Sequence, residues 1–184
     1  MENSKPSSSG VAFKWALIYL VTSIVITYVW QLLKVDQTSS VKYIGYIPFI
    51  AFLILAQKEF RDSLGGFITF GQAFVAGLLY SVFGAILISV FIYIYFTFLS
   101  PDVFSKIMDT QRDAMSQKGM SSDQVDQAMS VMNKYGTLIT AFFTIFAVAI
   151  FGIIVALIGA AILKKERTIL DIEQNSDSNP DPAV

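Results

Sequence analysis

The sequence predicts an all-α, polytopic membrane protein with four transmembrane helices and a two-helix amphipathic extracytoplasmic hairpin between the third and fourth spans. Charged residues make up 15% of the 184 residues and apolar residues 54%, whereas about a quarter of a soluble domain is charged. Asp, Glu, Lys and Arg are absent from four windows, at 15–33, 43–57, 67–99 and 135–163. Since a transmembrane helix needs about 20 apolar residues, three windows are long enough and the second is short.

The first span is predicted at 13–33, with Trp15 near one membrane interface and Trp30 near the other, where amphipathic rings are favoured. We expect residues 1–12 to be disordered, because this Ser-rich segment has too little apolar surface to offset the loss of chain entropy. The uncharged stretch is longer than the core of a signal peptide, so we interpret it as a retained helix.

The second span is predicted at 43–57, with its short apolar part extended by the stems of Lys42 and Lys58, which reach toward the headgroups. Pro48 is expected to kink this helix, because proline removes a backbone donor and clashes with the preceding turn. The polar segment at 57–63 is expected to end it.

The third span is predicted at 70–99, where Thr69 and Gln72 have the T-x-x-Q spacing of a capping box. A helix of this length measures about 45 Å and exceeds the hydrocarbon thickness. We therefore expect it to tilt, kink or protrude.

A helical hairpin is predicted at 100–137. Ser100 and Pro101 are typical of a helix start, and Ser121 with Gln124 forms the spacing of a second capping box. The fourth span is predicted at 138–163, and the acidic tail at 166–184 is expected to be disordered.

The orientation rests on basic residues at the span ends. Lys164, Lys165 and Arg167 directly follow the fourth span. Because such clusters stay on the cytoplasmic side, we expect both termini in the cytoplasm, the hairpin outside, and the protein in a bacterial inner membrane.

The composition excludes several kinds of site. The chain contains no Cys and no His, which removes disulfides, thiolate nucleophiles, imidazole bases and the metal sites built from those ligands. A net charge of −1 does not indicate binding of nucleic acid. The acidic pairs Asp109 with Asp113 and Asp123 with Asp126 are typical of solvated helix faces. We expect no enzyme activity, no catalytic residues, no metal and no cofactor.

Small residues recur at every fourth position of the third span, with a shorter row in the fourth. Helices in lipid associate through close backbone approach, so we predict that these rows pack the two spans together. A homodimer seam or a gated pore wall is the alternative. The helix-packing residues are Ala73, Gly77, Ser81, Ala85, Ser89, Gly152, Ala156 and Ala160.

All methionines other than Met1 lie in the hairpin. Four of them, Met108, Met115, Met129 and Met132, are candidates for a partner surface, because flexible thioether side chains suit adaptable interfaces. Packing of the hairpin on itself or on the bundle, a surface that rests on the membrane, and copper(I) binding are the alternatives.

Three segments resemble the bacterial membrane family catalogued as domain of unknown function 4199. They are KEFRDSLGGFITFGQAF at 58–74, YIYFTFLSPD at 93–102 and GIIVALIGAAILKKE at 152–166. The resemblance implies a four-helix inner-membrane protein with a helical extracytoplasmic insertion and no assigned role, and it carries over no catalytic residues. Its most specific motif contains Gly65, Gly66, Gly71 and Gln72, which is also the pattern of a turn and a helix cap.

Together these features favour a non-enzymatic structural or interaction subunit of the bacterial envelope. Its expected partners are the lipid bilayer and either an envelope protein or a second copy of the chain. A small oligomeric transporter or channel component is the alternative. A water-filled cavity reaching Thr22, Thr27 or Thr144 would favour that alternative, whereas hydroxyls bonded back to their own helix would not.

Overall fold

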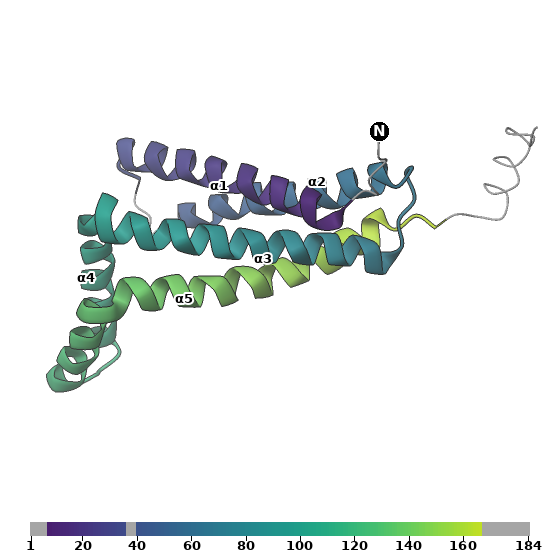
Figure 1. The fold of residues 1–184 in the computed structure, drawn as a ribbon. Helices are drawn as coiled ribbons and strands as arrows, with labels where there is room; N and C mark the ends of the chain where they lie inside the picture. Colours follow the sequence, from purple (N-terminus) through teal and green to yellow (C-terminus); the bar gives the residue numbers. More distant parts are fainter. Residues whose placement is uncertain (1–6, 36–39, 167–184) are drawn as a thin grey trace, which may run out of the picture.

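The computed structural model describes residues 7–35 and 40–166 as a helical bundle (Figure 1). The helices are α1 (Ser8–Leu32), α2 (Tyr46–Ser63), α3 (Phe70–Ile94), α4 (Pro101–Gln117) and α5 (Ser122–Leu163). A 3-10 segment, η1 (Ser40–Gly45), precedes α2, and a π-helical turn, η2 (Tyr95–Leu99), extends α3. In the described part of the chain, four helices are long and apolar enough to cross a membrane: α1, α2 with the end of η1, α3 with η2, and α5.

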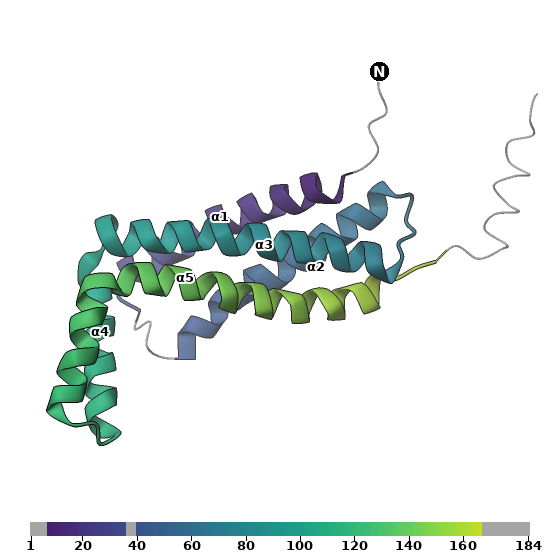
Figure 2. The same cartoon turned by 60° about the horizontal axis from the view of Figure 1, so that its bottom comes forward.

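Three of the long helices, α1, α3 and α5, run side by side roughly along a common axis, and α2 crosses them obliquely in the second view (Figures 1 and 2). The centre of the bundle is formed by α3 and α2. Each central helix contacts the other three, and the most extensive contact joins α3 to α5. The centre contains Tyr80, Phe49 and Leu53, which are at most 1% exposed. The rings of Phe49 and Tyr80 lie 5.3 Å apart. Large side chains therefore fill the space between the central helices.

The first helix begins earlier than predicted. Ser7 is the N-cap of α1 and accepts a hydrogen bond from the backbone N–H of Gly10 at 3.4 Å. Ala12 and Ala16 are fully buried because their small side chains let α1 approach its neighbours. The prediction of disorder at 1–12 is therefore wrong from residue 8 onward. The remaining predictions of disorder fall on residues 1–6 and 167–184, outside the described part of the chain.

The second helix continues past its predicted end at residue 57 to Ser63. The segment is amphipathic, because Gln57 and Phe60 face the bundle while Lys58 and Asp62 are exposed. Pro48 lies in the first turn of α2, where its missing N–H removes no intrahelical hydrogen bond. The kink predicted at Pro48 therefore has no cause at this position.

Both predicted capping boxes are present. Thr69 caps α3 together with Gln72, so the helix begins at Phe70 as predicted. Ser121 caps α5 together with Gln124. In each case the hydroxyl of the cap residue accepts a hydrogen bond from the backbone N–H of the glutamine three residues later. The side-chain oxygen of that glutamine accepts one from the backbone N–H of the cap residue.

The helix that contains the predicted fourth span begins well before residue 138, because α5 is one helix of 42 residues from Ser122 to Leu163. At 1.5 Å per residue it is about 63 Å long, about twice the hydrocarbon thickness. Its N-terminal part lies beside α4, and together they run across the axis of the bundle (Figures 1 and 2). The helix continues without a break through Gly136. A Cβ atom there would lie 2.7 Å from Cζ of Phe104, so the glycine allows α4 to approach.

Candidate functional site

The predicted helix-packing residues lie between α3 and α5 or next to this contact. All eight are buried. A Cβ atom on Gly77 would lie 2.8 Å from Cβ of Ala156, and one on Gly152 would collide with the side chain of Ser81. The Ser89 hydroxyl donates to the Ala141 carbonyl at 2.7 Å. The contact between α3 and α5 therefore combines close backbone approach with an interhelical hydrogen bond.

Gln57 joins three helices from inside the bundle, a role that the sequence did not reveal. Its side chain is fully buried, and Nε2 donates to the carbonyls of Ala73 on α3 and Ala156 on α5, at 3.0 and 2.9 Å. Oε1 has no hydrogen-bond partner in the described structure. The amide occupies space that two glycines leave open, since a Cβ on Gly77 would lie 2.6 Å from Nε2 and one on Gly159 would collide with Oε1.

The position of Gln57 explains why small residues are needed at part of the contact between α3 and α5. Two of its neighbours, Gly77 and Ala156, belong to that row, whereas Gly159 does not. The sequence contained one usable signal. Leu53, Gln57 and Phe60 share the i, i+4, i+7 spacing of one helix face, and all three are buried. Because Gln57 opens a polar segment, the sequence predicts the end of the span there.

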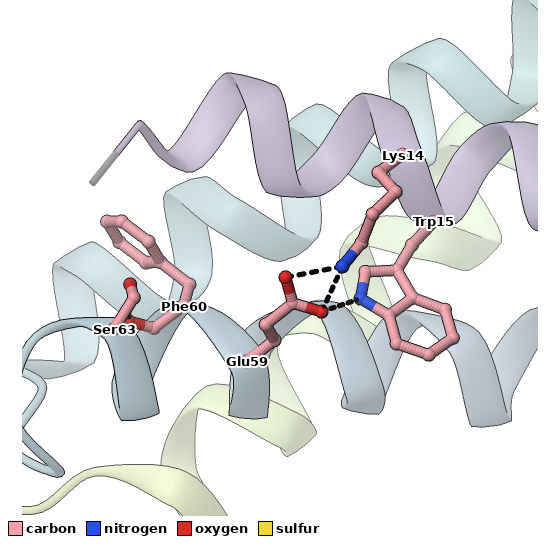
Figure 3. A network of polar contacts seen from close by, with 5 residues as sticks. All are labelled: Lys14, Trp15, Glu59, Phe60 and Ser63. Atoms are coloured by element: carbon pink, nitrogen blue, oxygen red, sulfur yellow. Dashed lines mark hydrogen bonds and ion pairs between the residues drawn. The ribbon is translucent and has the colours of Figure 1, made fainter. Parts of the chain in front are cut away.

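A polar network joins α1 to α2 close to the end of the bundle where α2 turns into α3 (Figure 3). Lys14 donates to both carboxylate oxygens of Glu59 at 2.5 Å, and the indole Nε1 of Trp15 donates to the same carboxylate at 2.9 Å. The Lys14 and Glu59 side chains are 51% and 37% exposed. Exposed ion pairs contribute about 0–1 kcal/mol, so the network orients the two helices more than it stabilises them.

The family-like motif forms the turn between α2 and α3. Gly65 and Gly66 have φ of 83° and 86°, in the left-handed region that favours glycine. Gln72 is part of the α3 cap, and no atom lies within 4 Å of a Cβ placed on Gly71. All four residues therefore fit a turn and a cap, and Gly71 is free to accept a larger side chain.

The same turn is tied to the end of α5. Ile68 and Lys165 form an antiparallel bridge with backbone hydrogen bonds of 2.9 and 3.0 Å. Beside it lies an open cavity of about 340 Å³, lined by residues of 64–72 and by Lys165 and Glu166. The side chains of Thr69 and Gln72 are engaged in the helix cap. The cavity wall is therefore mainly apolar, with one base and one acid at its edge.

The four candidate methionines lie between α4 and α5, and the expectation that they form a partner surface needs correction. Met108 and Met129 are each 6% exposed and form a cluster with Val125, and Met115 and Met132 pack against it. Thioether side chains fill irregular gaps between helices, and here they hold the two helices together. A partner surface on this pair has to use other side chains.

The three threonines that could have lined a polar cavity bond back to their own helices. Thr22, Thr27 and Thr144 each donate to the carbonyl four residues earlier at 2.8 Å. These contacts agree with the prediction that the three hydroxyls bond back to their own helix. Tyr95 and Thr97 of η2 differ, because their buried hydroxyls have no hydrogen-bond partner in the described structure.

A bundle of four apolar helices tied by small residues, a buried amide and back-bonded hydroxyls defines a multi-pass helical membrane protein. The sequence profile described as "Protein of unknown function (DUF4199)" matches residues 14–165. The chain therefore belongs to this family, which confirms the resemblance. No curated protein and no solved structure matches it.

Proposed function

We propose that this protein is a non-enzymatic interaction subunit of the bacterial inner membrane. In this proposal an envelope protein or a second copy of the chain binds the α4–α5 pair, which consists of α4 and of residues 122–135 of α5. The observation that carries the proposal is a row of exposed charged side chains on this pair. Asp102, Lys106, Asp109 and Asp113 follow the i, i+4, i+7, i+11 spacing of one face of α4, and all four are exposed. They do not take part in the packing of the bundle, so they are free to meet a partner.

The interior of the bundle supports this proposal over transport. Tyr80, Phe49, Leu53 and Gln57 fill the space between the central helices and are at most 1% exposed. A transport path along the axis requires these side chains to move together. The transporter alternative therefore depends on an oligomer or on a large rearrangement.

The fold also supports a cytoplasmic position for both termini. The start of α1, the end of α2 and the end of α5 lie at the same end of the bundle (Figure 1). They carry Lys14, Lys58, Arg61, Lys164 and Lys165. Basic residues at span ends favour the cytoplasmic side, so this end is assigned to the cytoplasm and the α4–α5 pair to the opposite side.

Affinity purification from detergent-solubilised membranes tests the proposal. The test variant is Asp109→Lys combined with Asp113→Lys, and the control is Asp62→Lys, another exposed Asp near the opposite end of the bundle. We expect an envelope protein or a differently tagged copy to co-purify with the wild type and the control and to be lost from the test variant. If all three yield only the bait, the interaction role is wrong, and flux assays in vesicles should test transport.

A further inference from the structure

The α4–α5 pair lies at one end of the bundle and projects sideways past α5 (Figures 1 and 2). Both views, which differ by a 60° turn about the horizontal, show it steeply inclined to the common axis of the spans (Figures 1 and 2). Because the spans follow the membrane normal, the pair runs along the membrane plane. Only Ser100 separates η2 from α4, and α5 continues from the pair into the bundle without interruption. The pair is therefore held at the level of the membrane surface.

Each helix of the pair has a stripe without charge. On α4 the stripe consists of Val103, Ile107, Thr110 and Ala114, and on α5 it consists of Gln124, Ala128, Val131 and Tyr135. Both have the spacing i, i+4, i+7, i+11, which follows one side of an α-helix. A second row lies one position before each stripe. On α4 it is the charged row described above, and on α5 it contains the charged residues Asp123 and Lys134.

The two uncharged stripes lie on the same side of the pair. The helices are antiparallel and meet through Met108 and Met129. Each stripe begins five residues before the methionine of its own helix, so it has the same angular offset from the contact. Two antiparallel helices are related by a two-fold axis perpendicular to the plane that contains them. Positions with equal angular offsets from the contact therefore lie on the same side of that plane, so both stripes lie on one side of the pair. Both charged rows then lie on the other side.

The uncharged side faces the spans. Phe104 lies on α4 between the methionine contact and the uncharged stripe, and its ring lies 5.5 Å from that of Phe96 in η2. On α5 the stripe continues from Tyr135 to Leu138 and Phe142, which are 59% and 56% exposed on the outer surface of the bundle. This surface faces lipid in a membrane. The uncharged side is therefore continuous with the lipid-exposed surface of the bundle.

We propose that the uncharged side of the α4–α5 pair rests on the bilayer, at the boundary between headgroups and acyl chains. Amphipathic helices in the plane of the interface bury their apolar face by roughly 5–10 Å. Val103, Val131 and Tyr135 supply apolar contacts, together with the part of the half-buried Ile107 side chain that does not pack against the methionine cluster. Thr110, Ala114 and Gln124 keep the contact shallow. The charged rows point to water, where they are available to the proposed partner. The inference requires a membrane-spanning bundle but not the proposed orientation or partner.

Single-cysteine labelling tests this docking site, because the chain contains no native cysteine. The variants are neighbouring pairs on the two sides of each helix, Ile107→Cys with Lys106→Cys and Ala128→Cys with Gln127→Cys. Each carries a nitroxide label in the full-length protein, reconstituted in vesicles of phosphatidylethanolamine and phosphatidylglycerol. We expect labels at 107 and 128 to collide several-fold more with oxygen than with a water-soluble nickel chelate, and labels at 106 and 127 to show the reverse.

Two outcomes would overturn the docking site. If the labels at 107 and 128 are as accessible to the nickel chelate as their neighbours, the uncharged side faces water. If they exclude both reagents at high and at low protein-to-lipid ratio, protein covers them instead. Circular dichroism of each labelled variant in the same vesicles establishes that it is folded. Loss of the partner in the purification experiment leaves these readings unchanged, so the two proposals fail separately.

Discussion

The two halves of α5 pack against their neighbours in different ways. Inside the bundle, α5 meets α3 and α2 through Gly152, Ala156 and Gly159, with Gln57 bonded to its backbone. In the α4–α5 pair, the same helix contributes the large side chains Val125 and Met129. Lipid removes the hydrophobic driving force between helices, so close approach and hydrogen bonds remain. Water provides that driving force, so helices that are in contact with water are held together best by large apolar side chains between them.

The largest loss of stability is expected at Gly159, where α5 lies against the side chain of Gln57. Gly159→Leu should destabilise the bundle by about 3 kcal/mol, the upper part of the usual range for overpacking, because the new side chain occupies the position of the Gln57 amide. Ala161→Leu is the control, since Ala161 is exposed on the same helix. Unfolding in mixed detergent micelles gives the difference. Equal stability of the two variants would show that α2 does not sit against Gly159.

A smaller loss is expected in the α4–α5 pair. Met129→Ala should cost about 2 kcal/mol, because it removes a buried side chain from the contact with α4. Ser130→Ala, at the adjacent exposed position, should change little. Hydrogen exchange should show loss of protection in the pair while the bundle stays protected. Uniform loss of protection across both regions would contradict the separation of the two packing modes.

Removing the buried amide should have a moderate effect. Gln57→Ala should cost about 1–2 kcal/mol, because two interhelical hydrogen bonds and some contact area are lost. The same change should make Gly159→Ala tolerable, since the collision partner is gone. A double-mutant cycle measures this coupling. Strictly additive losses would mean that Gln57 and Gly159 do not touch.

The smallest effect is expected for the exposed network of Figure 3. Glu59→Gln should cost less than about 0.5 kcal/mol, because the Lys14 ion pair is largely solvated and glutamine can still accept from Trp15. Tryptophan fluorescence should change only slightly. Glu59→Ala is the comparison that removes both contacts, and a large loss for Glu59→Gln alone would show that the charge matters more than its exposure suggests.

Capping signals correctly predicted the starts of α3 and α5. Thr69 with Gln72 and Ser121 with Gln124 form caps within four residues of chain, so their spacing is sufficient to locate them. The small residues of α3 and α5 were also visible as a pattern. Gln57 and the methionines were harder to predict. In sequence, a buried polar residue looks like a helix end, and a packing methionine looks like part of a partner surface.

The sequence by itself determined the class of the molecule and the family to which it belongs. Four stretches without charge, and the motif around Gly65 and Gly66, are enough for both. Only the tertiary structure decided which residues meet. Gln57 on α2 finds its acceptors on α3 and α5, at Ala73 and Ala156. The physical reason is distance along the chain: caps and span lengths depend on neighbouring residues, whereas buried partners depend on how whole helices are placed.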